Sequence, residues 1–210
     1  MTHQTWFECY SLDPVGLEYA ARHRDLYRAM AEHMAPNLSD STQVWDRIAF
    51  AILSANCRFE ASVAGLQYAR QHRGRVMGHT LAHVGGGMTQ VKAGWLNALP
   101  PILGLLKAKG EEWNNYRARL ARVRGLGITK ASFAACLLYP FESEVCCLDV
   151  WMLRGLAEPI PHRLTAYQRI ETRVQAYATQ IDLPLFLTQW ALWDWVRGRI
   201  EPHDIFRKDN

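Results

Sequence analysis

Apolar residues recur at helical spacing along most of this sequence, and no segment shows the period-two alternation of a half-buried strand. In residues 43–54, for example, Trp45, Ile48 and Ile52 fall on one side of a helix. With 210 residues, 49% of them hydrophobic, the chain is long enough for a substantial core. The pattern predicts an all-α fold with a loop at 72–88, helices over 14–34, 43–54, 59–71, 89–99, 111–123, 128–138, 165–181 and 184–197, and a short helix from Asp149.

The segment 111–138 is predicted to form two helices joined by a glycine turn, because helical spacing stops at Gly125-Leu126-Gly127 and then resumes. Glycines adopt backbone conformations closed to other residues and allow a partner to come close. The unpaired N–H groups at the start of the second helix suit a phosphate. Such contacts position a protein on DNA without reading its sequence. An ordinary helical hairpin would also contain a Gly-x-Gly turn, so the turn alone is weak evidence.

Basic residues gather around this turn. Seven basic and two acidic residues lie between Lys107 and Lys130, whereas the whole chain has a net charge of only +4. A charge run is usually a solvated helix face, but this one leads directly into the glycine turn. We therefore predict double-stranded DNA as a partner, with its backbone bound by Arg124, Gly125, Gly127, Thr129 and Lys130.

A single aspartate stands out beyond the turn. Asp149 follows an apolar stretch, 22 positions after Gly127, and it precedes Trp151 and Arg154 in a new helix. An aspartate at this place is suited to be an N-cap. It is also suited to stabilise a positive charge that develops in a reaction.

Several other features predict no special site. The five cysteines are odd in number and show no Cys-x-x-Cys spacing, so we expect free thiols rather than disulfides or an iron–sulfur cluster. His79 and His83 lack the glutamate and third ligand of a zinc site, and no metal is expected. Trp190, Trp193 and Trp195 are interpreted as core packing of the last helix with one ring exposed, and the Gly-rich segment 85–87 as a flexible turn near DNA.

Three segments resemble the helix-hairpin-helix DNA glycosylase superfamily, which includes endonuclease III, the adenine glycosylase of mismatch repair and the 8-oxoguanine glycosylases. They are Ile-Leu-Ser-Ala-Asn at 52–56, the hairpin at 123–131 and Leu-Asp-Val-Trp-Met at 148–152 followed by Arg154. Their order and spacing agree with the superfamily over residues 43–156. The resemblance implies that Asp149 is the essential carboxylate and that Asn56 reaches the gap left by an extruded base.

The resemblance also implies a two-lobed helical fold with a cleft between the lobes. We expect a single unit over 1–210, in which residues 43–156 form the core lobe with the hairpin (111–138) and Asp149. Residues 1–42 and 157–210 are expected to pack as the second lobe.

The departures from the superfamily pattern concern its chemistry. Lyase-competent members carry a lysine two positions after the second hairpin glycine, where this sequence has Thr129, with Lys130 one position later. Trp151 stands where the superfamily often has histidine, and the four-cysteine iron–sulfur loop is absent. The resemblance therefore implies an enzyme that has no lyase step and no cofactor.

A second resemblance, over residues 53–60, 125–133 and 147–149, is to a phage branch of the superfamily that is linked to thymine hypermodification. In that chemistry an amine, such as glycine or another amino acid, replaces pyrophosphate on 5-(pyrophosphoryloxymethyl)uracil in DNA. This resemblance implies a transferase with an amino acid as co-substrate. A monofunctional N-glycosylase remains the alternative, and a DNA-binding module without chemistry is disfavoured because Asp149 is retained.

In either reaction the target base must leave the helical stack. Asp149 would stabilise the developing sugar cation, or would accept a proton from the attacking amine. The pyrophosphate or the amino-acid carboxylate would be held by Lys130, Arg58 or Arg154. We expect the base pocket or the vacated gap to be formed by Asn56, Arg58, Phe59 and Trp151, and the alternative role for Asn56 is the C-cap of its helix.

The sequence gives no indication of a membrane partner. Met1 is followed by polar residues, and no stretch approaches the roughly 20 apolar residues that span a bilayer. We expect a monomer in the cytoplasm, which would be that of a bacterial host if the chain is phage-encoded.

Overall fold

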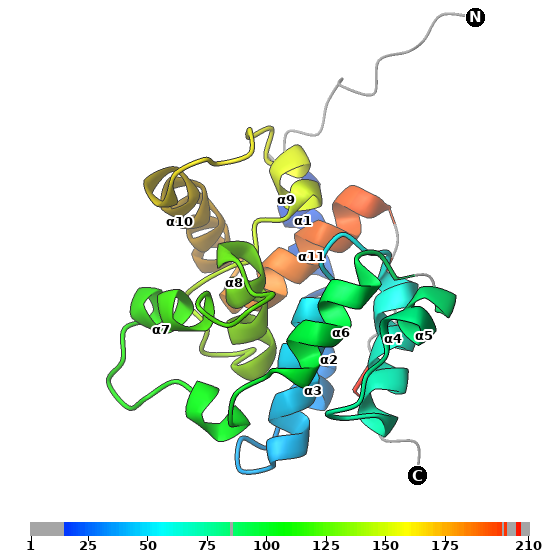
Figure 1. Cartoon of the computed structure of the whole chain (residues 1–210). Helices are drawn as coiled ribbons and strands as arrows, with labels where there is room; N and C mark the ends of the chain where they lie inside the picture. The colour runs from blue at the N-terminus through cyan, green and yellow to red at the C-terminus, as the bar shows by residue number, and fades with distance from the viewer. Residues whose placement is uncertain (1–14, 85, 199, 201–204, 207–210) are drawn as a thin grey trace, which may run out of the picture.

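The computed structural model describes residues 15–84, 86–198, 200 and 205–206, and all regular structure in this part of the chain is helical. The predicted all-α fold is thereby confirmed. Figure 1 shows the arrangement of the elements, which are α1 (Val15–Arg22), α2 (Arg24–Met34), α3 (Ser41–Leu53), α4 (Phe59–Gln71), α5 (Gly78–His83), α6 (Thr89–Asn97), the 3-10 turn η1 (Ile102–Leu105), α7 (Trp113–Leu120), α8 (Ile128–Leu138), α9 (Val150–Gly155), α10 (Leu164–Gln180) and α11 (Leu185–Arg197).

The helices agree with the sequence pattern at most places and differ at a few. The predicted helix over 14–34 is divided at His23 into α1 and α2, and its predicted start at residues 13 and 14 lies outside the described residues. The predicted loop at 72–88 contains the short helix α5. The helix predicted over 111–123 is shorter, because residues 111 and 112 are irregular and a turn begins at Ala121.

The buried apolar side chains form two clusters that meet along α11. The larger cluster contains buried side chains of α2 to α8, and α11 adds Phe186 and Trp190 to it. The smaller cluster is built from α1, α9 and α10, and α11 adds Leu185 and Leu192. Helix α11, which passes through the middle of the molecule in Figure 1, contacts α1, α2, α9 and α10. The division of the chain into lobes at residues 43 and 156 stays a prediction.

Helix α3 is the central helix of the larger cluster, because every residue from Val44 to Leu53 is buried. Its N-terminus is capped by Asp40, whose Oδ1 accepts a hydrogen bond from Thr42 N at 2.8 Å. Because α3 is buried along this length, its C-terminal end near Ser54 is held in place, and the segment that leads to Phe59 starts from there. Among the described residues, no helix is both long and apolar enough to cross a membrane.

Candidate functional site

Asp149 is held at the N-terminus of α9 by three N–H donors. Its Oδ1 accepts hydrogen bonds from Trp151 N at 3.0 Å and Met152 N at 2.9 Å, so the aspartate is indeed the N-cap of α9. Its Oδ2 accepts a hydrogen bond from the indole Nε1 of Trp193 at 3.0 Å. The residue is only half-buried. A negatively charged group is thus oriented by donors on both oxygens while it stays accessible to a partner.

The segment before Asp149 crosses the interior of the protein, and its backbone is bound by side chains from α10 and α11. The amides of residues 146, 147 and 148 donate in turn to Glu171 Oε1 (2.7 Å), Gln189 Oε1 (2.6 Å) and Tyr167 Oη (3.0 Å). Tyr167 Oη also donates to the carbonyl oxygen of residue 146 at 2.7 Å. We refer to residues 146–149 as the strap. Buried backbone polar groups need such partners, and here side chains supply them.

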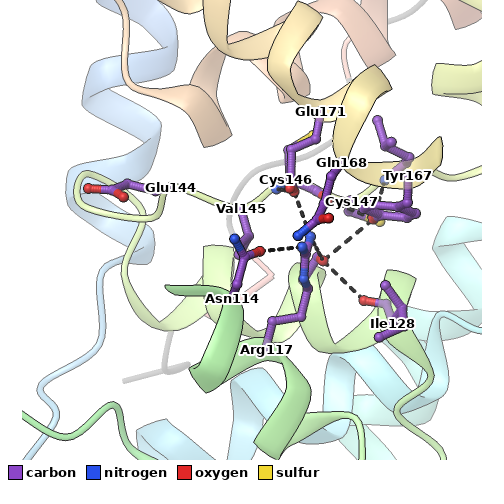
Figure 2. Close-up of polar contacts among 12 residues, drawn as sticks. Asn114, Arg117, Ile128, Glu144, Val145, Cys146, Cys147, Tyr167, Gln168 and Glu171 are labelled. Atoms are coloured by element: carbon purple, nitrogen blue, oxygen red, sulfur yellow. Dashed lines mark hydrogen bonds and ion pairs between the residues drawn. The ribbon is translucent and has the colours of Figure 1, made fainter. Parts of the chain in front are cut away.

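A buried ion pair supports one end of the strap. Arg117 Nη1 lies 2.7 Å from Glu171 Oε1, and the two side chains are 1% and 5% exposed. Arg117 also donates to Asn114 at 2.5 Å (Figure 2) and to Ser132 at 3.4 Å. Burial raises the pKa of the Glu171 carboxyl, whereas Arg117 opposes this rise because it favours the charged form.

The basic residues of the run do not share one exposed face. Arg117 points into the protein toward Glu171, and Arg119 forms an ion pair with Glu111 at 2.8 Å. Arg122 and Arg124 are exposed, and neither guanidinium has a hydrogen-bond or ion-pair acceptor among the described residues. Only part of the run is thus free to meet a partner.

Cations and aromatic rings surround Asp149. Trp151 is 38% exposed, and the guanidinium of Arg154 lies over its ring at 5.0 Å from the centroid. The guanidinium of Arg197 lies 4.1 Å from the Trp193 ring and 5.9 Å from that of Trp151. Trp193 packs against the smaller apolar cluster, as interpreted from the sequence, but its ring is only half-buried and its N–H also binds Asp149. The sequence analysis missed Arg197.

Phe59 connects this cluster to the beginning of α4. Its ring centroid lies 6.1 Å from that of Trp193 and 5.9 Å from that of Phe50 in α3. Arg58 precedes it as the N-cap residue of α4, and its side chain is exposed. Phe59, Trp151 and Arg154, which the sequence analysis had assigned to the site, are thus brought together around Asp149 and Trp193.

A second exposed group lies beyond the end of α3. Asn56 has the left-handed φ of 49°, and its Nδ2 lies 3.6 Å from the sulfur of Met88, which has a φ of 55°. The C-cap of α3 is Ser54, so the interpretation of Asn56 as a C-cap is wrong. Non-glycine residues in this region carry strain, and such residues cluster at functional sites.

Met88, which the sequence analysis did not single out, is the neighbour of Asn56 at this place. Its side chain is 48% exposed at the N-terminus of α6. A Cβ on Gly87 would lie 2.8 Å from the carbonyl oxygen of Asn56, so glycine permits the close approach of the two segments. The Gly-rich stretch before α6 was the only signal in the sequence, and it did not indicate which side chain would be presented.

The two glycines of the hairpin differ in their surroundings. Gly125 has φ +90°, and a Cβ there would lie 2.6 Å from the ring of Trp95, so both backbone and packing require glycine. Gly127 is the N-cap of α8, and a Cβ there would meet nothing within 4 Å. The fold needs Gly125, whereas Gly127 leaves the N-terminus of α8 open.

A hollow of about 330 Å³ lies beside the hairpin. Its lining combines an aromatic ring, two cations and small apolar side chains, namely Trp95, Arg122, Arg124, Ala98, Pro100 and Val123. Positive charge beside an open helix N-terminus is suited to a polyanion.

Lys130 points toward the C-terminal end of α3. Its Nζ donates to Ser54 Oγ at 2.9 Å, and the buried Lys92 donates to the carbonyl oxygen of Leu53 at 2.8 Å. Burial lowers the pKa of Lys92, Lys130 lowers it further, and the Cys57 thiol opposes the change. Two cations thus complement the negative end of the α3 dipole. Thr129 is half-buried in the first turn of α8.

The cysteines among the described residues are free, as the sequence analysis predicted. Cys146 and Cys147 are buried in the strap, and burial raises the pKa of Cys147 to about 12. Its thiol is therefore protonated near neutral pH and is a poor nucleophile.

Comparison with known proteins gives structural relatives only. No family model and no curated protein matches this sequence. The 8-oxoguanine glycosylase/lyase of Methanocaldococcus jannaschii, solved with a 15mer DNA containing 8-oxoguanine, superimposes with a TM-score of 0.74 at 17% identity, over 89% of this chain and 99% of the other. The 8-oxoguanine DNA glycosylase of Thermotoga maritima gives a TM-score of 0.71 at 19% identity, over 89% and 98% of the two chains.

This chain has the fold of the 8-oxoguanine DNA glycosylases. A second structure of the M. jannaschii enzyme agrees, with a TM-score of 0.74 at 15% identity over 89% of this chain and 95% of the other. The helix-hairpin-helix glycosylase fold that the sequence resemblance implied is confirmed.

Proposed function

We propose that this chain is a DNA-binding enzyme that acts on a modified base turned out of the double helix, with Asp149 as its catalytic carboxylate. The observation that carries the proposal is the half-exposed carboxylate of Asp149, fixed by three donors beside Phe59 and Trp193. The M. jannaschii relative was solved with DNA containing 8-oxoguanine, which supports a DNA ligand for this fold.

The hairpin is proposed to bind the DNA backbone. A phosphate approaches the open N-terminus of α8 at Gly127, where the first amides of the helix are unpaired and the helix dipole is positive. Arg122 and Arg124 add charge beside it. Because these groups meet phosphates only, the contact is expected to hold DNA of any sequence.

Asn56 and Met88 are proposed to fill the space that an extruded base leaves. Both are exposed, lie side by side and project from tightly constrained turns. Opening the stack costs a few kcal/mol, and a polar side chain together with an apolar wedge offsets that cost. Phe59 and Trp151 then provide aromatic faces for the base near Asp149.

The reaction that we place first is transfer of an amine to a pyrophosphorylated thymine derivative. The amine nitrogen forms a bond to the exocyclic carbon of 5-(pyrophosphoryloxymethyl)uracil, the C–O bond breaks, and pyrophosphate leaves with the bonding electrons. The amine gives up one proton, for which Asp149 is the acceptor. Arg154 and Arg58 are proposed to hold the pyrophosphate or the amino-acid carboxylate. Support comes from the sequence resemblance to the phage branch.

The second reaction is N-glycosylase activity without a lyase step, and the fold shared with 8-oxoguanine glycosylases favours it. Here the glycosidic bond breaks, water adds to the sugar, and Asp149 stabilises the cationic sugar that develops. Thr129 occupies the position at which lyase-competent members carry lysine, so the strand is expected to remain uncut.

Mass spectrometry of nucleosides and free bases separates the two reactions. The protein is incubated with duplex DNA that carries 5-(pyrophosphoryloxymethyl)uracil, with and without glycine and other amines, and with duplex DNA that carries 8-oxoguanine and other damaged bases. A new amine-bearing nucleoside in intact strands supports the transferase. A released base with no new nucleoside supports the glycosylase. Neither product from any of these duplexes would contradict the proposed function.

A further inference from the structure

We propose that α10 and α11 together position Asp149 for chemistry, through Tyr167 and Glu171 on the first helix and Gln189 and Trp193 on the second. This inference rests on the proposed function, because it names the residues that act through the same carboxylate. None of the four is a catalytic residue in our account, since Asp149 alone among the five meets the reacting atoms.

The spacing of these residues matches the geometry of the strap. Tyr167 and Glu171 are four positions apart in α10, and Gln189 and Trp193 are four positions apart in α11, so each pair lies on one face of its helix. The two helices contact each other, and the strap lies along them. Each helix thus offers two fixed side chains that are one helical turn apart.

The hydrogen bonds follow the strap in order and end at the carboxylate. Glu171 binds the amide of residue 146, Gln189 that of residue 147, and Tyr167 that of residue 148. Trp193 then binds Oδ2 of Asp149 itself. Four consecutive residues are each fixed by a different side chain, so neither the path of the backbone nor the direction of the carboxylate is left free.

The polar chemistry of these residues points to positioning rather than to folding alone. Glu171 needs the buried Arg117 as its partner, and a buried ion pair seldom stabilises a fold more than apolar residues of similar volume do. A displacement of a reacting group by about 1 Å can cost about a hundredfold in rate. We therefore infer that the buried polar groups around the strap serve to fix the position of the Asp149 carboxylate.

Three variants test the proposal, with Trp113→Phe as the control. Trp193→Phe removes the N–H donor and keeps an aromatic ring beside Phe59 and Arg197. Gln189→Met removes the acceptor at nearly constant volume, whereas Gln189→Glu retains an acceptor oxygen. Trp113 is also half-buried, but it packs against Tyr116 and Tyr139, away from Asp149.

Two measurements do not depend on activity. Hydrogen exchange of the amide of residue 147 is expected to become about tenfold faster in Gln189→Met, because its acceptor is lost. In ¹H–¹⁵N spectra the indole resonance that disappears in Trp193→Phe belongs to Trp193. That resonance is expected to shift in Asp149→Asn, and the indole of Trp113 is not. If the exchange rate and the Trp193 resonance both stay unchanged, the positioning contacts are refuted.

The third measurement compares rate with affinity. On whichever modified duplex yields product, Trp193→Phe and Gln189→Met are expected to lower the single-turnover rate about tenfold or more while DNA affinity stays close to that of the parent. Gln189→Glu, which keeps an acceptor oxygen, is expected to retain most of the single-turnover rate of the parent. Equal losses of rate and affinity in all variants, including Trp113→Phe, would overturn the proposal. If no duplex yields product, the proposed function fails. Hydrogen exchange of the amide of residue 147 and the Trp193 indole resonance then still decide whether the positioning contacts exist.

Discussion

The hairpin and the strap represent opposite ways to build one site. At the hairpin, Gly127 leaves the N-terminus of α8 open, and Arg122 and Arg124 have no acceptor within the described part of the chain. In the strap, every amide from residue 146 to 148 is buried against a side-chain acceptor. A surface that meets a repeating phosphate backbone tolerates variation in where it binds, whereas a carboxylate that meets one reacting centre does not.

The largest effect is expected at the ion pair beneath the strap. Glu171→Leu leaves Arg117 buried without its carboxylate, which costs about 3–5 kcal/mol of folding free energy. The double variant with Arg117→Met removes both charges and is expected to recover much of that loss. Chemical denaturation of both variants measures the difference. If the single variant is as stable as the parent, the strap is not supported in the way described.

The next effect concerns the glycine that the fold itself requires. Gly125→Ala places a Cβ 2.6 Å from the Trp95 ring at a φ of +90°, and we expect a loss of about 1–3 kcal/mol in stability. Thermal unfolding measures it. If Gly125→Ala unfolds at the same temperature as the parent, the claim that the fold requires Gly125 but not Gly127 is contradicted.

Gly127→Thr separates binding from folding. Threonine caps a helix about as well as glycine and meets no neighbour here, so stability is expected to stay close to that of the parent. Its side chain blocks the approach of a phosphate, and we expect DNA affinity to fall about tenfold on every sequence tested. A loss confined to one sequence would mean that the hairpin reads bases.

The smallest effect is expected at the hollow beside the hairpin. The slope of log affinity against log salt is negative. Arg122→Ala and Arg124→Ala are each expected to make it less steep by about one. Arg119→Ala is the control, because Arg119 is already paired with Glu111. Fluorescence anisotropy with a labelled duplex over a range of salt concentrations gives the slopes. Equal slopes for the parent and the three variants would exclude Arg122 and Arg124 from the interface.

Local patterns in the sequence predicted local features well. The bounds of α4 and α8 agree with the pattern, and the break between α7 and α8 falls at the predicted glycines, because spacing and turn residues act over a few positions. Asp149 begins α9 as expected, for the same reason.

Contacts between distant segments could not be predicted from one sequence. Trp193 lies 44 positions from Asp149, and no periodicity in α11 distinguishes an indole that binds a carboxylate from one that only packs. Which residues of the basic run are exposed could not be predicted for a similar reason, because the partner that draws Arg117 inward is Glu171, 54 positions away. Charge patterns along a chain do not reveal which helix will cover them.

The central claim is that Asp149 performs chemistry on an extruded base and that DNA is bound elsewhere. The most direct test is Asp149→Asn, because asparagine retains an oxygen that can cap α9 while the negative charge is lost. Product formation in a single turnover is measured beside DNA affinity for the parent and the variant. We predict that the rate falls by about 10²–10³-fold or more while affinity changes little. An unchanged rate, or a loss of affinity as large as the loss of rate, would contradict this account.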